Sequence, residues 1–552
     1  MRRALLLLLL ALSIAPYFVG LGDNAIWDAN EAFYVETPRQ MVERGDYLNP
    51  SFNGRPRLNK PPLSYWIVAA FYGAFGVSVE TERVAIALGA MLLIATAFLI
   101  GRRAWSADAG LLAALALASS PRVVMFARRI FIDVYIAAFM GLTLLCLVLA
   151  ESQPARRRTW LALMYVAMGL AFMTKGPMAI VLPGIVVLAW LAMDRRLADL
   201  GRLMLPAGAL IVAAIAVPWY AALYAEHGWT HIRTFFIDEN LARFSAPYDA
   251  TAAGRGPLFY LPVLLTDLFP WSIFLPAALY AAARTVWTTR AGAPARRLPL
   301  LLLTWIVVIV GFFTLSKTKQ DLYIFPAVTA IAALVGGLLG PSVTAAPGAA
   351  RPLVRWTALA AGALIAVSGA GILFLFASAA RVYAIDGAAL TGWAAVVAGL
   401  AAAGFALRGR TFASVATMGA AAVAMNWIFV TAALPSFRQY QPVPAMSDQI
   451  RARASVGARA GYYRMALPSL TYYLGRPVVE LFDPSALSAT FEAGEAWVLM
   501  TARDHATVAP SLTRPTCVAA RAPLFDVKIG NVLDRKPLAE LLLVTNRCSP
   551  GL

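Results

Sequence analysis

Two short segments near the N-terminus bring carboxylates, aromatic rings and a lysine together. The first is N-E-A-F-Y-V-E-T-P-R-Q-M, Asn30–Met41, and the second is L-N-K-P-P-L-S-Y-W, Leu58–Trp66. Both follow a single apolar stretch, where the connections of a helical protein are usually short and plain. Loops rich in ionisable and aromatic side chains concentrate binding and catalysis. The two segments therefore predict an active-site loop at a membrane surface.

These residue types suit the transfer of a sugar from a lipid-linked phosphate. Lysine and arginine stabilise a phosphate leaving group, and carboxylates stabilise an oxocarbenium-like sugar or orient the acceptor. The sequence has no G-x-S-x-G, P-loop or H-E-x-x-H motif, which argues against a hydrolase, a nucleotidase and a zinc protease. Nothing in it resembles a nucleotide-sugar site, so a lipid-linked donor is favoured.

The composition is that of a protein built mainly from membrane-spanning helices. Hydrophobic residues make up 60% of the 552 residues and charged residues 14%, whereas a soluble domain has about 45–50% apolar residues. The mean hydropathy is +0.69. Three histidines and three cysteines are too few for a dedicated His/Cys metal cage. No certain cofactor is predicted, and a divalent metal is left open.

Apolar runs of spanning length predict about thirteen transmembrane helices. The first run has a signal-like basic start but no small-x-small cleavage site after it, so we interpret it as a retained span; a removed signal peptide is the alternative. The predicted spans are Ala4–Leu21, Val84–Ile100, Gly110–Ser119, Val134–Ala150, Trp160–Met173, Met178–Met193, Leu203–Leu223, Tyr260–Ala282, Leu298–Phe313, Ile324–Gly340, Trp356–Ala377, Leu390–Leu407 and Phe412–Leu434.

The loop charges give an orientation, because cytoplasmic loops carry an excess of lysine and arginine. Alternate connections of this count hold the basic clusters Arg2/Arg3, Arg102/Arg103, Arg156–Arg158, Arg195/Arg196/Arg202, Arg284/Arg290/Arg296/Arg297, Arg351/Arg355 and Arg408/Arg410. This side is predicted to be cytoplasmic, together with the N-terminus. The other connections then face outward, and an odd number of spans leaves the C-terminus outside.

A second set of cations contradicts the positive-inside pattern. These residues lie in predicted outward loops and are Lys60, Arg128, Arg129, Lys175, Arg243, Arg255, Lys317 and Lys319. Binding an anionic substrate explains them; contact with lipid phosphates is the alternative. The middles of the spans are nearly free of ionisable groups, which argues against an ion-coupled transporter or a lipid-carrier flippase. The chemistry is therefore predicted at the outer leaflet.

The chain changes character after Leu434. Residues 435–552 are mixed and polar, with β-rich pieces at Pro477–Leu481, Ala496–Met500 and Leu541–Thr545, so we expect residues 1–434 to form the transmembrane catalytic domain and residues 435–552 an outward-facing α/β domain. Cys517 and Cys548 both lie in this outward part and are predicted to form a disulfide in an oxidising compartment. Cys146 lies within a span and is predicted to be a core residue.

Eight motifs in consistent order and spacing resemble one family. Asn30–Met41 resembles the D-E-x-x-Y-x-E-x-x-R-x-M signature of bacterial polyprenyl-phosphate-dependent glycosyltransferases with the GT-C fold, and Leu58–Trp66 resembles their E-K-P-P-x-x-Y-W. The further matches are A-R-R-I-F-I-D (Ala127–Asp133), T-K-G-P (Thr174–Pro177), P-W-Y (Pro218–Tyr220), E-N-L-A-R-F (Glu239–Phe244), G-P-L-F-Y with F-P-W (Gly256–Trp271) and S-K-T-K-Q-D-L-Y-I-F-P (Ser316–Pro326). They cover about the first 330 residues and mark the protein-mannosyltransferase-like superfamily.

Within that superfamily the chain most resembles the transferases that place 4-amino-4-deoxy-L-arabinose on lipid A. The resemblance implies an all-α polytopic membrane protein of GT-C type, about thirteen transmembrane helices with a C-terminal periplasmic α/β domain. It also implies an inverting glycosyltransferase in the bacterial inner membrane, with an undecaprenyl-phosphate-linked donor, a lipid A acceptor, surrounding membrane lipids, no nucleic acid, and a monomeric state. A protein O-mannosyltransferase remains the alternative enzyme, because sister families share the motifs.

Two positions depart from the family pattern. Asn30 stands where the family has the aspartate of its D-E pair, and Asn59 stands where it has the glutamate before the lysine. Asn30 cannot act as a general base, although Asp28 lies nearby. A phosphate acceptor is already anionic near pH 7 and needs no base, whereas a serine or threonine hydroxyl does. The departures therefore favour a lipid A phosphate as acceptor.

The resemblance and the residue types together assign candidate roles. Glu31 is the leading catalytic residue, with Asp133, Asp28 and Asn30 in the same set; a helix N-terminal carboxylate is the alternative for Glu31, and capping for Asp133. Lys60, held by Pro61 and Pro62, leads the substrate-binding set, with lipid-facing snorkelling as its alternative. The rest of that set is Tyr34, Arg243, Arg255, Lys317, Lys319 and Tyr323.

Overall fold

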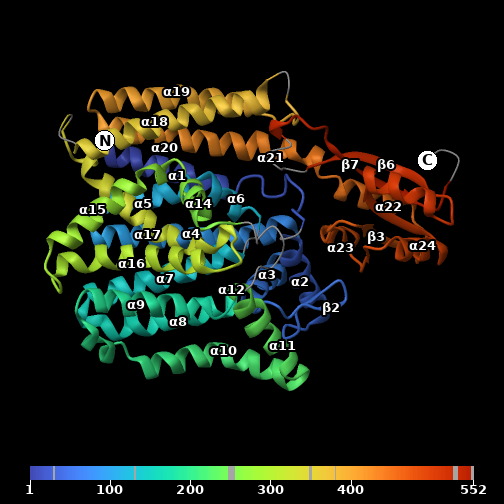
Figure 1. The fold of residues 1–552 in the computed structure, drawn as a ribbon, viewed down its shortest axis with the longest axis horizontal. Helices are drawn as coiled ribbons and strands as arrows, with labels where there is room; N and C mark the ends of the chain where they lie inside the picture. The colour runs from blue at the N-terminus through green and yellow to red at the C-terminus, as the bar shows by residue number, and fades with distance from the viewer. Residues whose placement is uncertain are drawn as a thin grey trace.

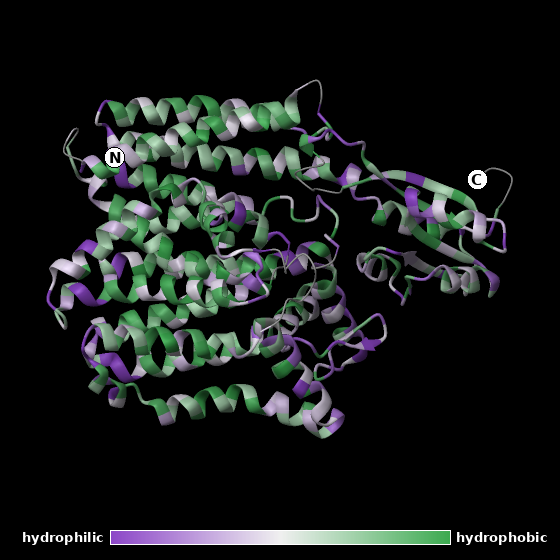
Figure 2. Cartoon of the chain, viewed as in Figure 1, coloured by the Kyte–Doolittle hydropathy of each residue, from purple (hydrophilic) through white to green (hydrophobic). Residues whose placement is uncertain are grey.

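A helical bundle with a sheet-containing domain at one end makes up this protein (Figure 1). The computed structural model describes residues 1–28, 31–129, 132–245, 255–346, 348, 351–378, 381–525 and 532–548, and for Arg243 the backbone alone. Apolar residues run along the bundle helices, and hydrophilic residues gather at the helix ends and in the sheet domain (Figure 2). A bilayer imposes this distribution, because helices satisfy their own backbone groups within it.

Each of the thirteen predicted apolar spans coincides with helix. The helices concerned are α1 (Arg2–Ile14), α4 (Val79–Ala104), α5 (Ala107–Ala118), α7 (Ile132–Ser152), α8 (Arg157–Lys175), α9 (Met178–Met193), α10 (Leu205–His227), α14 (Tyr260–Asp267) with α15 (Leu275–Thr288), α16 (Pro294–Leu315), α17 (Val328–Leu339), α18 (Pro352–Ile372), α19 (Ala388–Leu407) and α20 (Thr411–Ile428). Among the described residues, eight helical segments are long and apolar enough to cross a membrane, or ten with two bent pairs. The multi-pass helical class is confirmed, and the number thirteen is not.

Two predicted spans are not the straight helices that their hydropathy indicates. The run Gly110–Ser119 belongs to α5, which meets α6 (Pro121–Ala127) at a bend of 62°, and the run Tyr260–Ala282 is broken between α14 and α15 by a bend of 118°. Proline explains both breaks, because Pro121 and Pro270 cannot donate a backbone hydrogen bond and clash with the preceding turn. Hydropathy averages over such a break and does not detect it.

The centre of the bundle is tightly packed through small residues. Residues Ala113 to Ala118 of α5 are at most 1% exposed. A Cβ atom at Gly336 of α17 would lie 2.2 Å from the carbonyl oxygen of Ala109, so the two helices approach as closely as glycine allows. Small residues at such contacts are typical of helices packed within membranes. The close contact gives the site elements at the helix ends a rigid base.

Short elements cover the end of the bundle nearest the sheet domain. They are α2 (Glu31–Arg44), the hairpin β1 (Ser51–Phe52) and β2 (Arg55–Pro56), α3 (Leu63–Phe75), α11 (Trp229–Arg233), the π-helical turn Thr234–Ala242, α12 (Arg243–Ser245) and the 3-10 segments Pro257–Phe259 and Asp321–Ala327. The helix α2 begins at Glu31, one of the sequence-predicted candidates. Every family-like motif falls within or beside one of these elements or on a helix end that faces them.

The C-terminal part forms the predicted α/β domain. Its five strands are β3 (Arg459–Tyr463), β4 (Val479–Leu481), β5 (Ala496–Thr501), β6 (Cys517–Leu524) and β7 (Ala539–Thr545), in the order β4-β3-β5-β7-β6. Strands β4, β3 and β5 run parallel to one another, and β7 runs antiparallel to both of its neighbours, β5 and β6. Alternate residues of β5 and β7 enter two apolar clusters, one on each face. The helices α22 (Val443–Arg453), α23 (Ser469–Leu474), α24 (Pro484–Glu492) and α25 (Ala502–Val508) accompany the sheet.

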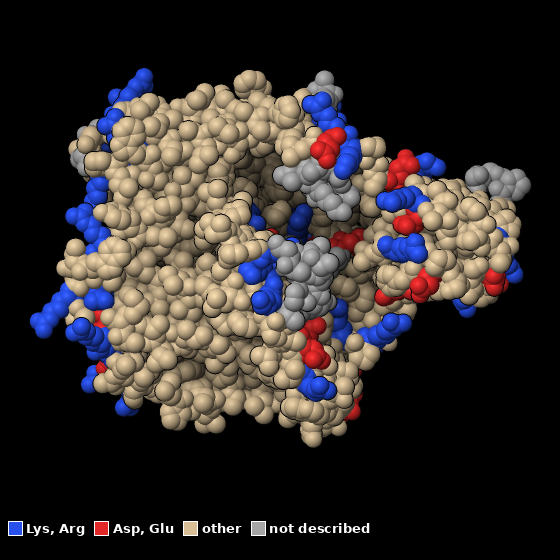
Figure 3. Space-filling view, viewed as in Figure 1, with Lys and Arg blue, Asp and Glu red and all other residues tan. Residues whose placement is uncertain are grey.

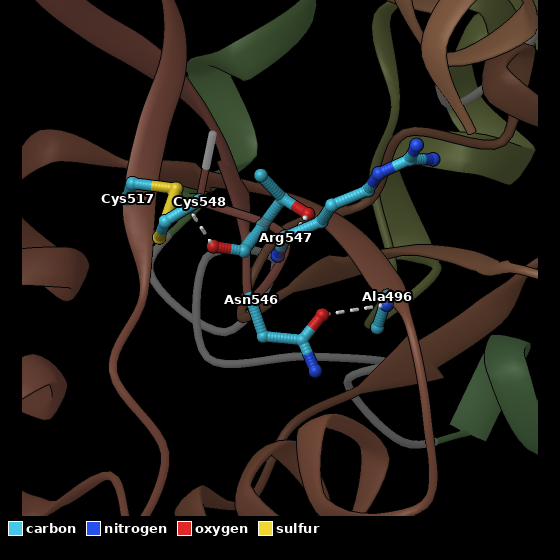
Figure 4. Close-up of a disulfide and its surroundings, with 6 residues drawn as sticks. Ala496, Cys517, Asn546, Arg547 and Cys548 are labelled. Atoms are coloured by element: carbon cyan, nitrogen blue, oxygen red, sulfur yellow. Dashed lines mark hydrogen bonds between the residues drawn. A yellow bond between two sulfur atoms is a disulfide. The ribbon is translucent and has the colours of Figure 1, made fainter. Parts of the chain in front are cut away.

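A disulfide joins Cys517 to Cys548 at the outer edge of this sheet (Figure 4). The Cα atoms are 5.7 Å apart and 31 residues separate the two cysteines, as the sequence predicted. Next to it, the Oδ1 atom of Asn546 accepts a hydrogen bond from the N–H of Ala496 at 3.0 Å. The third cysteine, Cys146, is free and buried in α7. The boundary between residues 434 and 435 stays a prediction.

The sheet domain is docked on the N-terminal loop by specific hydrogen bonds. The N–H of Ile26 donates to the Tyr473 hydroxyl at 2.8 Å, and the N–H of Ser469 donates to Asp28 Oδ1 at 2.8 Å. The Asn53 amide of the hairpin turn exchanges two hydrogen bonds with the backbone of Val478, at 2.8 and 2.9 Å. The helix α23 therefore holds the segment that precedes α2, and the residue before β4 holds the hairpin that follows α2.

Candidate active site

A cavity of about 1120 Å³ lies where the bundle meets the short elements. Its wall comes from α2, the loop before α3, the first turns of α7, the end of α8, the π-helical turn, the end of α16 and residues 316–323. One side is apolar, with Met140 and Leu182 and the rings of Phe312 and Phe313. Six residues predicted from the sequence line it: Tyr34, Lys60, Asp133, Arg255, Lys319 and Tyr323. A charged wall facing an apolar wall suits a lipid with a phosphate headgroup.

Asp133 and Lys175 form an ion pair across two helix ends in the cavity wall. Asp133 lies in the first turn of α7 and Lys175 is the last residue of α8. An anion at a helix N-terminus and a cation at a C-terminus each interact favourably with the helix dipole. The Lys175 ammonium also lies 5.4 Å from the centre of the Tyr323 ring. Three motifs of the sequence therefore meet at one point.

Lys60 forms the second ion pair of the cavity, with Glu239. Its Nζ atom lies 3.3 Å from Glu239 Oε2, and the two side chains are 20% and 16% exposed. Lys60 is positioned by Pro61 and Pro62, which restrict the backbone immediately before α3 begins. Because the pair is partly exposed and not ideally short, an incoming anion can compete with Glu239 for the ammonium.

The cavity wall carries more positive than negative charge. Among the described residues its cations are Arg57, Lys60, Lys175, Arg255 and Lys319, and its carboxylates are Asp133, Glu239 and Asp321. Each carboxylate already has a partner. Asp133 pairs with Lys175 and Glu239 with Lys60. Asp321 binds Arg122 of α6 at 2.7 Å. In the described part of the chain no salt bridge joins the remaining three cations to a carboxylate.

These three cations are held by uncharged groups. The Arg57 guanidinium lies over the Phe33 ring at 3.8 Å, and Arg255 lies over Phe259 at 4.9 Å and donates to the Lys319 carbonyl. The Lys319 ammonium, 7% exposed, donates to the Ser316 carbonyl at 2.7 Å. A carbonyl or a ring orients a cation without neutralising it. The cavity therefore offers uncompensated positive charge to an anion.

Comparisons with known proteins agree with this geometry. Residues 1–236 match the family described as dolichyl-phosphate-mannose-protein mannosyltransferase. The crystal structure of ArnT from Cupriavidus metallidurans bound to undecaprenyl phosphate superposes with a TM-score of 0.79, at 22% sequence identity and over 98% of each chain. The first 236 residues are thus similar in sequence to this mannosyltransferase family, and the chain shares the fold of the ArnT structure. Its GT-C fold, predicted from eight motifs, is confirmed.

Curated relatives match different lengths of the chain. The undecaprenyl phosphate-alpha-4-amino-4-deoxy-L-arabinose arabinosyl transferase 2 of Pseudomonas fluorescens is 32% identical over 351 residues, which are 63% of this chain and 58% of that protein. The transferase of the same name, without the number, in Pseudomonas savastanoi pv. phaseolicola is 28% identical over 493 residues, 86% of this chain and 87% of that one. The chain thus spans less than two thirds of the first relative's length.

Glu31, the leading catalytic candidate, does not line the cavity. Its side chain is fully buried and forms a 2.8 Å ion pair with Arg83 of α4, which is equally buried. The N–H of Trp27 donates to the other carboxylate oxygen at 2.6 Å, and Arg83 donates further to the carbonyls of Asn24 and Ala25. A carboxylate saturated in this way positions the loop before α2. The alternative interpretation, a carboxylate at the start of a helix, describes its location.

The other predicted residues divide between the cavity and its surroundings. Asp28 lies at the contact with the sheet domain, where burial raises the pKa of its carboxyl group to about 6 despite the hydrogen bond from Ser469. Lys317 is exposed and does not line the cavity. Tyr34 is buried against Tyr65, and burial raises the pKa of its hydroxyl well above the usual value, so it stays protonated. Asn30 and the side chain of Arg243 lie outside the described residues.

Several cavity residues were not in the candidate catalytic or substrate-binding set, although Lys175 was among the outward cations explained by an anionic substrate. Lys175 and Glu239 lie in family-like motifs, so the motifs themselves carried the signal, and Arg57 directly precedes the L-N-K-P-P segment. By contrast, Arg128 was expected to face an anionic substrate but donates instead to the carbonyls of Pro16, Val19 and Gly20. A sequence shows that a cation is present but not whether carbonyls of the same chain already occupy it.

The structure offers no ready metal centre within its described residues. These include no group of three or more histidine, cysteine or acidic side chains placed to hold an ion. The two outward histidines lie together, with ring centres 5.3 Å apart, and His227 hydrogen-bonds to Asn49 at 2.7 Å. Glu239, in the π-helical turn that follows α11, pairs with Lys60.

Proposed function

We propose that this protein transfers 4-amino-4-deoxy-L-arabinose from undecaprenyl phosphate to a phosphate group of lipid A. The observation that carries the proposal is the cavity with three cations, Arg57, Arg255 and Lys319, that have no carboxylate partner among the described residues, facing an apolar wall. A polyprenyl phosphate has the matching parts, an anionic head and an apolar chain. The relatives named above act on undecaprenyl-phosphate-linked aminoarabinose by their names.

The reaction needs a cation cluster more than it needs a base. An oxygen of the acceptor phosphate attacks the anomeric carbon of the sugar, the bond from that carbon to the carrier phosphate breaks, and its electron pair leaves with undecaprenyl phosphate. Lys60, Lys319 and Arg255 lie where they would stabilise the charge that develops on the carrier phosphate. The Tyr34 hydroxyl, protonated in its buried position, is a donor on the same wall.

The acceptor side of the proposal rests on Asp133 and on the two asparagines. Asp133 is engaged by Lys175, which orients the carboxylate without freeing it to abstract a proton. The cavity wall has Asn59 where the motif that this segment resembles has glutamate. An acceptor that is already ionised tolerates both features, whereas a protein hydroxyl needs a base. This favours lipid A phosphate over the alternative, protein O-mannosylation.

We place the reaction at the periplasmic face of the bacterial inner membrane. The disulfide of the sheet domain requires an oxidising compartment, and this domain sits beside the cavity. Lysine and arginine side chains also line the opposite end of the bundle (Figure 3), as the positive-inside rule requires of a cytoplasmic face. Both features support an N-terminus in the cytoplasm and a sheet domain in the periplasm.

Mass spectrometry of lipid A tests the proposed substrate. Cells that make undecaprenyl-phosphate-linked aminoarabinose and lack other transferases should add one aminopentose to lipid A only when this chain is expressed. The Lys60→Ala variant, expressed to the same level, should add far less. Unmodified lipid A together with mannosylated periplasmic proteins would establish the alternative enzyme and refute the proposed acceptor.

A further inference from the structure

A second, smaller cavity lies at the end of the bundle away from the sheet domain. It measures about 140 Å³ and is lined by Arg2 of α1, by Ser342, Ala345 and Ala346, and by residues 409–413. Helix α1 runs from Arg2 toward the loop before α2, and α20 runs from Thr411 toward the sheet domain (Figure 1). The two cavities are therefore separated by the length of these helices, and the small one is no part of the site described above.

The N-terminus of α20 supplies hydrogen-bond donors to this cavity. The helix has 18 residues and no side chain caps its first turn. Its first backbone N–H groups have no carbonyl acceptor one turn earlier, as at the start of every helix, and they carry the positive end of the helix dipole. Helix N-termini of this kind bind phosphate and other anions.

The side chain of Thr411 is an independent sign of a missing ligand. Thr411 lines the cavity and is 4% exposed, and its buried Oγ1 atom has no hydrogen-bond partner among the described residues. A buried hydroxyl without a partner is costly and uncommon in folded proteins. A ligand oxygen in the cavity would satisfy it.

Two arginines add positive charge and no described carboxylate opposes them. The Arg2 guanidinium is fixed by hydrogen bonds to the carbonyls of Val343 and Ala345, at 3.0 and 2.7 Å, and lies 5.3 Å from the centre of the Phe412 ring. Arg410 is exposed at the mouth and has no ion pair in the described part of the chain. The nearby Asp108 is bound by Arg3 at 2.7 Å, so it does not neutralise the pocket.

We infer that this cavity binds a single phosphate group. The volume suits one tetrahedral oxyanion, the Thr411 hydroxyl and the N–H groups of α20 provide donors, and Arg2 and Arg410 provide charge. Arginine and helix N-termini are the usual partners of phosphate. The group can belong to an anionic lipid headgroup of the adjoining leaflet or to free inorganic phosphate, and the two sources share this recognition chemistry.

Binding measurements on the full-length protein test the inference. Inorganic phosphate is titrated into protein in a neutral detergent, at constant ionic strength set with chloride, and ligand-dependent thermal stabilisation is recorded. In parallel, protein in phosphatidylcholine nanodiscs with and without phosphatidic acid is examined by native mass spectrometry for retained anionic lipid. The variants are Arg410→Gln and Thr411→Val, and Arg408→Gln is the matched control, because Arg408 is exposed nearby but does not line the cavity.

Each result has one meaning. Arg410→Gln and Thr411→Val should each weaken binding about 10-fold or more, the loss expected for one hydrogen bond to a charged group, while Arg408→Gln should leave it within twofold. A loss in the phosphate titration identifies free phosphate as the ligand, and a loss confined to retained phosphatidic acid identifies a lipid headgroup. Binding by neither probe, equal binding by all variants, or an equal loss in Arg408→Gln would overturn the inference.

Discussion

Each of the two N-terminal motif segments contributes one residue to an ion pair, and the two pairs differ in how exposed they are. Glu31 and Arg83 are both fully buried, and each has further hydrogen bonds to the backbone around residues 24–27. Lys60 and Glu239 are partly exposed, lie 3.3 Å apart and face the large cavity. The first pair has no vacant position for a substrate, and the second opens directly onto one.

This difference in exposure indicates which charged residues are available to a substrate. A buried pair is held by its low-dielectric surroundings, so losing one partner leaves an uncompensated charge and destabilises the fold. A partly exposed pair is weak, and its members exchange partners at small cost. We therefore expect Glu31 to act on stability and Lys60 to act on the substrate, and the predictions below test this division.

The largest effect should follow from Glu31→Ala. It leaves the Arg83 guanidinium buried without its carboxylate, which costs about 3–5 kcal/mol in comparable pairs. We expect a lower melting temperature and poor yield, with the carrier-lipid affinity of the surviving folded protein near normal. Thermal denaturation in detergent and a carrier-lipid binding assay measure the two quantities.

A double variant sharpens this prediction. Glu31→Leu with Arg83→Met removes both charges of this buried pair, although the carbonyls of Asn24 and Ala25 lose their donor. It should recover part of the stability lost in Glu31→Ala. If the Glu31→Ala protein kept the wild-type melting temperature but lost transfer, Glu31 would be a catalytic residue, as its motif indicates.

Lys60→Ala should show the opposite pattern. Removing one charge that stabilises the leaving phosphate costs about 2.7–4 kcal/mol, or roughly 100- to 1,000-fold in rate, whereas the melting temperature should change little. Transfer is measured with the lipid-linked donor and lipid A, and carrier-lipid affinity is measured separately. Near-normal transfer would show that the loop before α3 is scaffold.

Glu239→Gln should have a smaller effect than Lys60→Ala, and it should strengthen carrier-lipid binding. The carboxylate competes with an incoming phosphate for the Lys60 ammonium, 3.3 Å away. A pair of this exposure contributes about 0.2–1 kcal/mol, so neutralising Glu239 should tighten carrier-lipid binding a few-fold. Asp321→Gln is the matched control, because Asp321 is also on the cavity wall but pairs with Arg122. Weaker binding in Glu239→Gln would mean that Glu239 itself contacts the substrate.

The motifs predicted the fold and the cavity wall better than they predicted individual roles. Residues as far apart as Tyr34, Asp133 and Tyr323 were expected to meet because they lie in outward loops, and the structure brings them together. The role of Glu31 could not be inferred in the same way. Its partner Arg83 lies 52 residues further along the chain, at the start of a long apolar helix and outside any motif.

Other differences arise from properties that hydropathy does not contain. The bends at Pro121 and Pro270 interrupt stretches that are apolar on average, so the number of spans was less certain than their class. The strands β3 and β6 were not predicted because neither is a continuous apolar run: β3 begins with Arg459, and β6 is interrupted by Arg521 and Pro523. The disulfide was predicted, because two cysteines alone lay in the outward part of the sequence.

The smallest expected effect concerns how the sheet domain is held beside the cavity. Asp28 accepts the N–H of Ser469, and burial raises the pKa of its carboxyl group from the usual 3.8 to about 6. The docked state therefore binds a proton more tightly than the undocked one. The contribution of Asp28 to docking is full below about pH 4 and is lost as the pH rises through 6.

Asp28→Asn should remove that dependence, because an uncharged amide can still accept the Ser469 hydrogen bond and is not ionised at any pH in this range. Hydrogen exchange of α23 measured between pH 4 and 7, corrected for the intrinsic rate, should rise with pH in the wild type and stay flat in the variant.

Asp46→Asn is the control. Hydrogen bonds from Asn49 and Leu48 lower the pKa of Asp46, so its contribution is lost only as the pH falls, and the slope above pH 4 should be unchanged. A wild-type protein whose α23 is equally protected at pH 4 and pH 7 would show that the Asp28 carboxylate is accommodated in its ionised form, and that the loop and the sheet domain form one rigid unit across this pH range.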